Sequence, residues 1–273
     1  MRKIVTFARL GTYGRFANQL FQISGTIGIA RRNGFDFAFP PWRKHAALKF
    51  GQPDLDVQAR FEHPLPLYTG EPLPEHFVEF GYRDVRLRRS VSLLGFFQSE
   101  RFFSHCLDEV KHYFRMKDEP PLNDYCAIHW RAGDYGAAPT KYKPKGNPAH
   151  PRMTMHYYKP AMAMFGSNQK DLVFSDDIAA AKDLFGDRVE YSTGLDYLED
   201  FRLMKRCRHF IISNSSYSLM AAILGEHPDK QVVGPSPWFG GPDARTLDER
   251  DILSPGWHVV HYETGLIKTK KAA

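Results

Sequence analysis

The chain has 273 residues, of which 42% are hydrophobic and 25% are charged; these ordinary proportions indicate a folded globular protein and exclude intrinsic disorder. The net charge of +6 suits partners that carry phosphate, but the basic residues are scattered and no nucleic-acid-binding module is recognisable. No apolar run of about 18 residues predicts a membrane-spanning helix. We expect a cytoplasmic protein, with weak attraction of the basic clusters at 86–89 and 268–271 to an inner membrane surface as the alternative.

The polar segment 116–123 contains two prolines and reads as a linker between two halves of similar size. Each half opens with a short apolar strand and then alternates strands with helices, which predicts an α/β fold with parallel sheets. We therefore expect domains at 1–118 and 124–273. The three cysteines lack metal-ligand spacing and read as buried, reduced side chains.

In the first half, residues 4–7 form the first predicted strand, and a loop with Gly11 and Gly14 follows it. Apolar residues then recur at helical spacing, which predicts a helix over 15–32. Alternation over 35–39 predicts a second strand, which the following pair of prolines ends.

The second half shows a more regular alternation of strands and helices. The predicted strands are 125–130, 172–174, 189–191, 210–212 and 232–233, and the predicted helices are 154–165, 178–185, 198–206 and 217–224. Thr154 is expected to cap the first of these helices. The pattern is typical of a doubly wound nucleotide-binding sheet, in which ligands bind beyond the carboxyl ends of the strands.

The strand at 125–130 carries His129 near its end and leads into Arg131, Gly133 and Asp134. An arginine guanidinium is planar and permanently charged, so it suits bidentate binding of phosphate. A surface turn with a salt bridge between Arg131 and Asp134 explains the same residues equally well. Both interpretations stay open.

The strand at 172–174 is followed by Ser175, Asp176 and Asp177. A carboxylate here can accept hydrogen bonds from the N1–H and N2–H₂ groups of guanine and so select guanine over adenine. Helix capping by one of the two aspartates is the simpler interpretation.

The strand at 210–212 is followed by Asn214, Ser215 and Ser216, just before a helix. Hydroxyls and free N–H groups at a helix N-terminus bind anions. An ordinary serine cap is the alternative. The same residues spell an N-glycosylation acceptor, which we treat as chance.

In the first half, Arg15 and Asn18 follow the glycine loop on the first turn of the predicted helix. The loop lacks the length and the lysine of a Walker loop, so the role of these two residues does not follow from chemistry alone. Taken together, the polar residues after the strands indicate a nucleotide diphosphate held between two Rossmann-like domains.

These residues stand in a pattern that resembles a known family. The segment GRFANQLFQISGTIGIARRNG resembles the N-terminal motif of bacterial α-1,2-fucosyltransferases, and its opening also resembles the protein O-fucosyltransferases. Further segments are similar to this family in the same order: LLGFFQSERFF at 93–103, HWRAGDY at 129–135, VFSDD at 173–177 and LMKRCRHFIISNSSYSLMAAIL at 203–224.

The resemblance implies a GT-B fold with two Rossmann-like domains facing a cleft, the N-terminal one on the acceptor side and the C-terminal one binding GDP-fucose. It implies transfer of fucose with inversion and no metal or other cofactor, to O-2 of a terminal β-galactoside in an oligosaccharide or polysaccharide. It places Arg131 on the β-phosphate, His129 and Asp176 or Asp177 near the guanosine, and the serines at 215–216 near the phosphates. It places Arg15 and Asn18 at the donor.

The chain departs from the family pattern in two places. Ala132 replaces a second arginine, and Leu219-Met220 replaces a pair of tryptophans. We expect an arginine at position 132 to be tolerated. The general base is not identifiable, and Asp134, Glu100 and His45 are candidates by residue type alone. The alternatives are a transferase that uses another GDP-sugar and a nucleotide-sugar-binding protein without turnover.

Overall fold

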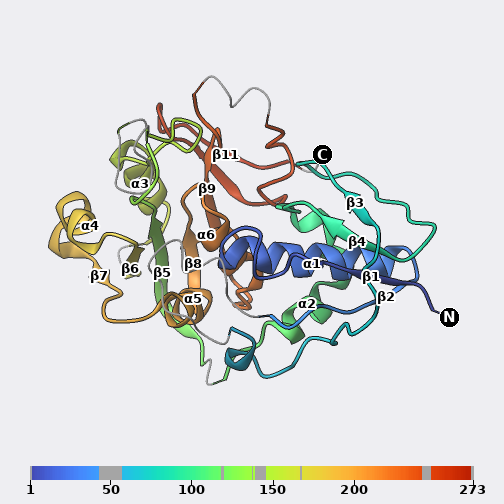
Figure 1. Ribbon diagram of the computed structural model, residues 1–273. Coiled ribbons are helices and arrows are strands. Elements are labelled where there is room, and N and C mark those ends of the chain that lie inside the picture. Colours follow the sequence, from blue (N-terminus) through green and yellow to red (C-terminus); the bar gives the residue numbers. More distant parts are fainter. Residues whose placement is uncertain are drawn as a thin grey trace. The chain divides into compact units, whose positions relative to one another are not determined.

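The computed structural model describes residues 2–42, 57–117, 120–136, 138, 146–166, 168–241 and 247–271 (Figure 1). The chain divides into two compact units. The first comprises Met1–Asp118 with Arg250–Ile252, and the second comprises Glu119–Glu249 with Leu253–Ala273. The roles expected for the two domains, acceptor side and donor binding, stay predictions.

The first unit is built on a four-stranded sheet in the order β2-β1-β4-β3, and all of its strand pairs are parallel. The strands are β1 (Ile4–Thr6), β2 (Asp36–Phe37), β3 (Glu75–Phe77) and β4 (Val91–Leu94). Its helical segments are α1 (Phe16–Arg32), η2 (Gln58–Arg60), η3 (Glu100–Phe102), η4 (Ser104–Cys106) and α2 (Leu107–Tyr113). The helix α1 packs on β1 and β2 and is buried over most of its length.

A glycine lets α1 approach the neighbouring backbone closely. A Cβ atom at Gly28 would lie 2.1 Å from the carbonyl oxygen of Phe102 in η3, a separation that no side chain can occupy. The helix therefore needs glycine at this position in order to pack against η3.

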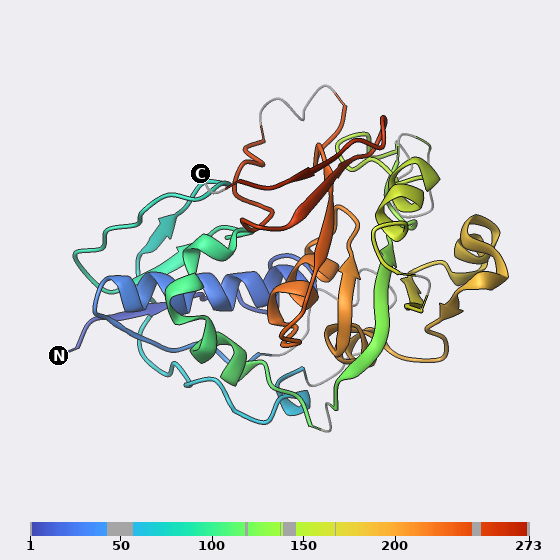
Figure 2. The ribbon, with the colours of Figure 1, turned by 180° about the vertical axis from the view of Figure 1, so that it is seen from behind.

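The second unit is built on a seven-stranded sheet in the order β11-β10-β9-β8-β5-β6-β7, in which only β11 is antiparallel to its neighbour. The strands are β5 (Leu122–Trp130), β6 (Lys170–Ser175), β7 (Glu190–Tyr191), β8 (Cys207–Ile211), β9 (Val232–Ser236), β10 (His258–His261) and β11 (Ile267–Thr269). Counted from β5, the parallel strands lie in the order 3-2-1-4-5-6, the order of a Rossmann sheet. Its switch point lies between β5 and β8, which stand side by side in Figure 2.

Helices connect these strands: α3 (Met155–Met162), α4 (Ile178–Phe185), η5 (Gly186–Arg188), α5 (Tyr197–Lys205) and α6 (Ser216–Leu224). Side chains alternate along β5, as the pleat requires. Ile128 and Trp130 join a core cluster with Tyr157 and Tyr158 of α3, whereas His129 bonds to Ser218 of α6. The two faces of the central strand are thus covered by different helices.

The predicted α/β fold with parallel sheets is confirmed. Thr154 does precede α3, but the prediction that it caps the helix is wrong, because its side chain makes no capping hydrogen bond. The predicted linker is shorter than expected, since β5 already begins at Leu122. Within the described ranges, no helix is long and apolar enough to cross a membrane.

Candidate active site

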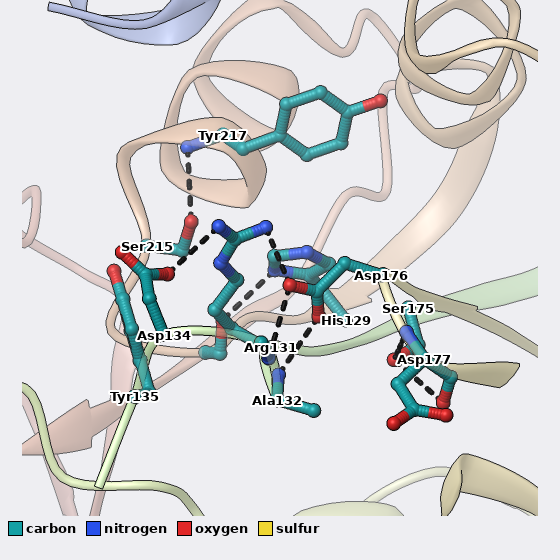
Figure 3. Close-up of polar contacts among 12 residues, drawn as sticks. His129, Arg131, Ala132, Asp134, Tyr135, Ser175, Asp176, Asp177, Ser215 and Tyr217 are labelled. Carbon is teal, nitrogen blue, oxygen red and sulfur yellow. Dashed lines mark hydrogen bonds and ion pairs between the residues drawn. The ribbon is translucent and has the colours of Figure 1, made fainter. Parts of the chain in front are cut away.

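The first group of predicted site residues lies in the loop after β5. The Arg131 guanidinium lies between two carboxylates: one Nη atom is 2.8 Å from Asp134 and the other is 2.8 Å from Asp176 (Figure 3). Burial lowers the pKa of Arg131, but the charges of Asp176 and Asp134 outweigh it and hold this pKa above its ordinary value. The salt bridge that the sequence left as an alternative is therefore present, together with a second one.

Asp176, at the end of β6, holds the loop after β5 in place. Its two carboxylate oxygens accept hydrogen bonds from the backbone N–H groups of Ala132, at 2.8 Å, and Gly133, at 3.0 Å. With the ion pair to Arg131, both oxygens are engaged. Asp176 thus sets the position and orientation of the guanidinium, and its contact with guanine stays a prediction.

The neighbouring residues Ser175 and Asp177 serve the start of α4. Asp177 accepts a hydrogen bond from the Ala180 N–H at 3.1 Å and caps the helix. The Ser175 hydroxyl accepts from the Asp177 N–H at 3.0 Å. The capping interpretation of this segment therefore describes Asp177, and a direct role of either residue at the donor stays a prediction.

His129 is buried, with an exposed fraction of 5%. Its Nδ1 lies 2.8 Å from the Ser213 hydroxyl and 2.9 Å from the Ser218 hydroxyl. Burial, with a smaller contribution from the Arg131 charge, lowers the pKa of His129 to about 3. The ring is neutral near pH 7, so it can contribute hydrogen bonds to this site but no charge.

The segment after β8 is fixed by polar contacts from several sides. The Asn214 amide donates to the carbonyl oxygens of Pro151, at 3.1 Å, and Trp238, at 3.2 Å. Ser215 caps α6 by accepting from the Tyr217 N–H, and Ser216 is the first residue of the helix. The ordinary serine cap is thus present. The first turn of α6 lies at the carboxyl edge of the sheet, shortly after the end of β8.

The amide oxygen of Asn214 is unusual. It is buried, and it accepts no hydrogen bond from any residue in the described part of the chain. An unsatisfied buried acceptor is unfavourable by about 1–3 kcal/mol. A hydroxyl or amine of a bound ligand would satisfy this oxygen.

The structure brings the residues from β5, β6 and β8 into one cluster at the switch point of the sheet. Asp176 links the β6 end to the β5 loop, and His129 links β5 to Ser213 after β8. Two residues that the sequence analysis did not select complete these links. Tyr135 donates to the Asn214 carbonyl oxygen at 3.1 Å, and Arg152 donates to the carbonyl oxygens of Ala132 and Tyr135.

Sequence reasoning also missed Asp200, on α5. Its carboxylate accepts a hydrogen bond from the Ser192 hydroxyl at 2.5 Å. Burial raises the pKa of Asp200 to about 6, although the Ser192 bond opposes the shift. No motif marked this aspartate, because a carboxylate on a predicted amphipathic helix looks like an ordinary surface residue.

Arg15 and Asn18 belong to the first unit. Arg15 occupies the N-cap position of α1, where its side chain makes no capping hydrogen bond. The Asn18 amide oxygen accepts from Gln98 at 2.7 Å. Their contact with the donor stays a prediction.

Of the general-base candidates, Glu100 lies in η3 and His45 lies outside the described residues.

Ala132 is only 3% exposed and belongs to the core cluster that contains Tyr157 and Tyr158. An arginine at this position would have to displace packed side chains or move the loop. The structure thus argues against the expectation that Ala132→Arg is tolerated. Among the residues that the structure describes, no three His, Cys, Asp or Glu side chains gather to form a possible metal site.

Comparisons with known proteins match this chain to glycosyltransferases. The family model described as Glycosyl transferase family 11 matches residues 121–261, more than half of the chain. The O-antigen biosynthesis glycosyltransferase WbnK of Escherichia coli is 34% identical over 42% of this chain and 39% of its own length. An alpha-1,2-colitosyltransferase of Escherichia coli is 26% identical over 59% of this chain and 61% of its own length.

Each of these matches covers less than two thirds of the relative. Among solved structures, that of NodZ alpha-1,6-fucosyltransferase superposes with a TM-score of 0.50 at 13% identity. The superposition covers 88% of this chain and 97% of NodZ, and it supports the fold.

Proposed function

The chain belongs to glycosyl transferase family 11, and from this membership we propose that it transfers L-fucose from GDP-fucose to a hydroxyl group of an acceptor sugar, without a metal. The family expected from the sequence is confirmed. O-2 of a terminal β-galactoside is the proposed acceptor atom, with inversion at the anomeric carbon of fucose. The GT-B arrangement of the two units and a cytoplasmic location are parts of the same proposal.

The observation that carries this proposal is the placement of Arg131 with Asp134 and Asp176, which we call the Arg131 cluster. It lies at the switch point of a sheet with Rossmann strand order, where such sheets bind nucleotides. The guanidinium is held in a fixed orientation by Asp176, which is itself anchored by two backbone N–H groups. A preorganised cation beside the start of α6 suits a diphosphate.

In the proposed reaction the bond between the anomeric carbon of fucose and the β-phosphate oxygen breaks, and GDP leaves with the bonding electrons. The acceptor oxygen forms a bond to the same carbon, and its proton passes to a general base or to the leaving diphosphate. Negative charge develops on the β-phosphate, and the fixed charge of Arg131 with the N–H groups of α6 stabilises it. A phosphate at Arg131 competes with Asp134 for the guanidinium, so Asp134 is the carboxylate that donor binding would release.

A second candidate function is transfer of colitose from its GDP derivative. The similarity to the alpha-1,2-colitosyltransferase favours it. Colitose is L-fucose without the 3-hydroxyl group, so both donors present the same diphosphate to the Arg131 cluster. The two functions differ only in the contacts made to the sugar.

The test is a panel of donors with a β-galactoside acceptor and EDTA present, analysed by mass spectrometry. GDP-fucose, GDP-colitose, other GDP-sugars and UDP-sugars are compared. We expect the galactoside to gain one fucose when GDP-fucose is the donor and EDTA is present. A higher product yield from GDP-colitose than from GDP-fucose would establish the second function. Transfer only from UDP-sugars, or only after Mn²⁺ is restored, would refute both functions.

A further inference from the structure

The loop after β4 contains a strained residue. Phe97 has a φ of 52°, and it is the only residue other than glycine with a positive φ among the described residues. Such a conformation is unfavourable by about 1–3 kcal/mol and persists only where the surroundings impose it. Phe97 is 2% exposed, and its ring packs edge to face against Phe7 and Phe102. The strain is thus fixed by the core of the first unit.

The strained residue sets the direction of its two neighbours: Phe96 contacts the loop after β1, and Gln98 contacts the first turn of α1. The Phe96 ring stacks on Tyr13, with ring centroids 4.9 Å apart and an angle of 22° between the planes. The Gln98 amide donates to Asn18 at 2.7 Å. All four side chains are partly exposed. Tyr13, Phe96 and Gln98 form a small surface that we call the Tyr13–Phe96 platform.

The platform lies at the edge of the sheet where parallel α/β sheets bind their ligands. β1 and β4 are neighbouring parallel strands, with Val5 paired to Val91. The loops that follow them therefore leave the same carboxyl edge of the sheet. None of the residues Tyr13, Phe96 and Gln98 belongs to the donor site proposed above.

The chemistry of the platform suits a sugar. Aromatic rings stack on the C–H groups of a pyranose, and planar amides exchange hydrogen bonds with its hydroxyls. Galactose has an axial O-4, which leaves one face of its ring lined by the hydrogens of C3, C4 and C5. The bond to Asn18 uses one donor of the Gln98 amide, so the Gln98 carbonyl oxygen can accept from a sugar hydroxyl.

We propose that the Tyr13–Phe96 platform binds the terminal galactoside of the acceptor, with the stacked rings against its apolar face and the Gln98 amide on its hydroxyls. The proposal rests on the proposed transferase function, which supplies the acceptor. Phe96 and Gln98 are then specificity-determining residues for the acceptor, and the strain at Phe97 is what presents them.

The first test is steady-state kinetics of Phe96→Ala and Gln98→Met with methyl β-D-galactoside as acceptor. The expected result is a KM for the acceptor raised tenfold or more in Phe96→Ala, with unchanged affinity for GDP. Phe96→Trp should retain a KM close to that of the wild type. Phe77→Ala is the matched control, because Phe77 is a 64% exposed phenylalanine of the same unit outside the platform. An unchanged acceptor KM in both platform variants would overturn the proposal.

A direct binding measurement separates this proposal from the proposed function. Ligand-observed NMR detects methyl β-D-galactoside on the protein without any turnover. The platform predicts saturation transfer to the C3, C4 and C5 hydrogens in the wild type and its loss in Phe96→Ala. Galactoside binding without transfer would contradict the transferase function alone. Transfer with equal NMR signals from wild type and Phe96→Ala would contradict the platform alone.

Discussion

At the scale of single residues, the proposed fucosyl transfer depends most on Arg131. Sequence reasoning selected it because an arginine directly after a buried strand suits a phosphate, and the structure places it in a cluster with Asp134 and Asp176. We predict that Arg131→Ala lowers kcat by about 10²-fold or more, as the loss of a preorganised donor does. GDP affinity should fall less, because the charge acts mainly in the transition state. Steady-state kinetics and calorimetric titration of GDP measure the two effects.

Arg131→Lys is the matched control, since it keeps one positive charge but loses the planar fork that contacts both carboxylates. It should recover only part of the lost rate. Circular dichroism must show that both variants are folded, because Arg131→Ala leaves both carboxylates without an ion pair and Arg131→Lys cannot reach both of them. A folded Arg131→Ala enzyme with near-normal kcat would reduce Arg131 to a loop-stabilising residue.

A second prediction concerns Asp200, because burial raises the pKa of its carboxyl group to about 6, above the ordinary range of an aspartate. A carboxyl group with a raised folded-state pKa stabilises the fold below the unfolded pKa, and that stability is lost as pH rises through 6. Asp200→Asn keeps an oxygen for the Ser192 hydroxyl and removes the charge. Its melting temperature should therefore rise relative to the wild type between pH 4 and pH 8. An equal difference at both pH values would show that Asp200 titrates normally.

The residue types of the site could be predicted from the sequence, but their partners could not. Arg131, Asp134 and Asp176 were each selected by position after a strand. That Asp176 binds the backbone of the β5 loop depends on β5 and β6 being neighbours, a relation that one sequence does not contain. Asp200 was missed for the same reason, because its burial comes from the packing around α5.

At the scale of elements, the long and regular segments were predictable. The helix α4 was predicted with the bounds that the structure shows, and α1 differs by one residue. The strands β3, β4, β10 and β11 were not predicted. β4 and β10 have four residues each. β3 and β11 have three residues each and no buried face, because Phe77 and Ile267 are largely exposed. Without alternation or a buried run, a short strand leaves no periodic signal.

A prediction at this scale concerns the contact between α1 and η3. Gly28→Ala places a methyl group against the Phe102 carbonyl oxygen, which is backbone and cannot rotate away. The variant should lose about 1–3 kcal/mol of unfolding free energy, the usual effect of overpacking. Urea denaturation measures the loss. Gly166→Ala is the control, because a Cβ there meets nothing within 4 Å, and equal stability of the two variants would mean that α1 can shift.

At the scale of the whole molecule, the alternation of strands and helices was enough to predict an α/β fold with parallel sheets. The strand order was not predictable, since it is set by long-range pairing between segments with similar apolar sequences. It is this order that puts β5 beside β8 and brings His129 to Ser213. The proposed roles of the two units, acceptor binding in the first and donor binding in the second, belong to the same scale. The platform and donor experiments test them separately.

The claim on which the others depend is that the second unit binds guanosine diphosphate at the Arg131 cluster. The most direct test is the melting temperature of the wild type and Arg131→Ala with GDP or UDP. A ligand that binds only the folded state at ~100 times its Kd adds about 2.7 kcal/mol of stability. We predict a clear rise of the wild-type melting temperature with GDP, none with UDP, and a smaller rise with GDP in Arg131→Ala. Equal shifts from both nucleotides, or no shift from GDP, would contradict the account.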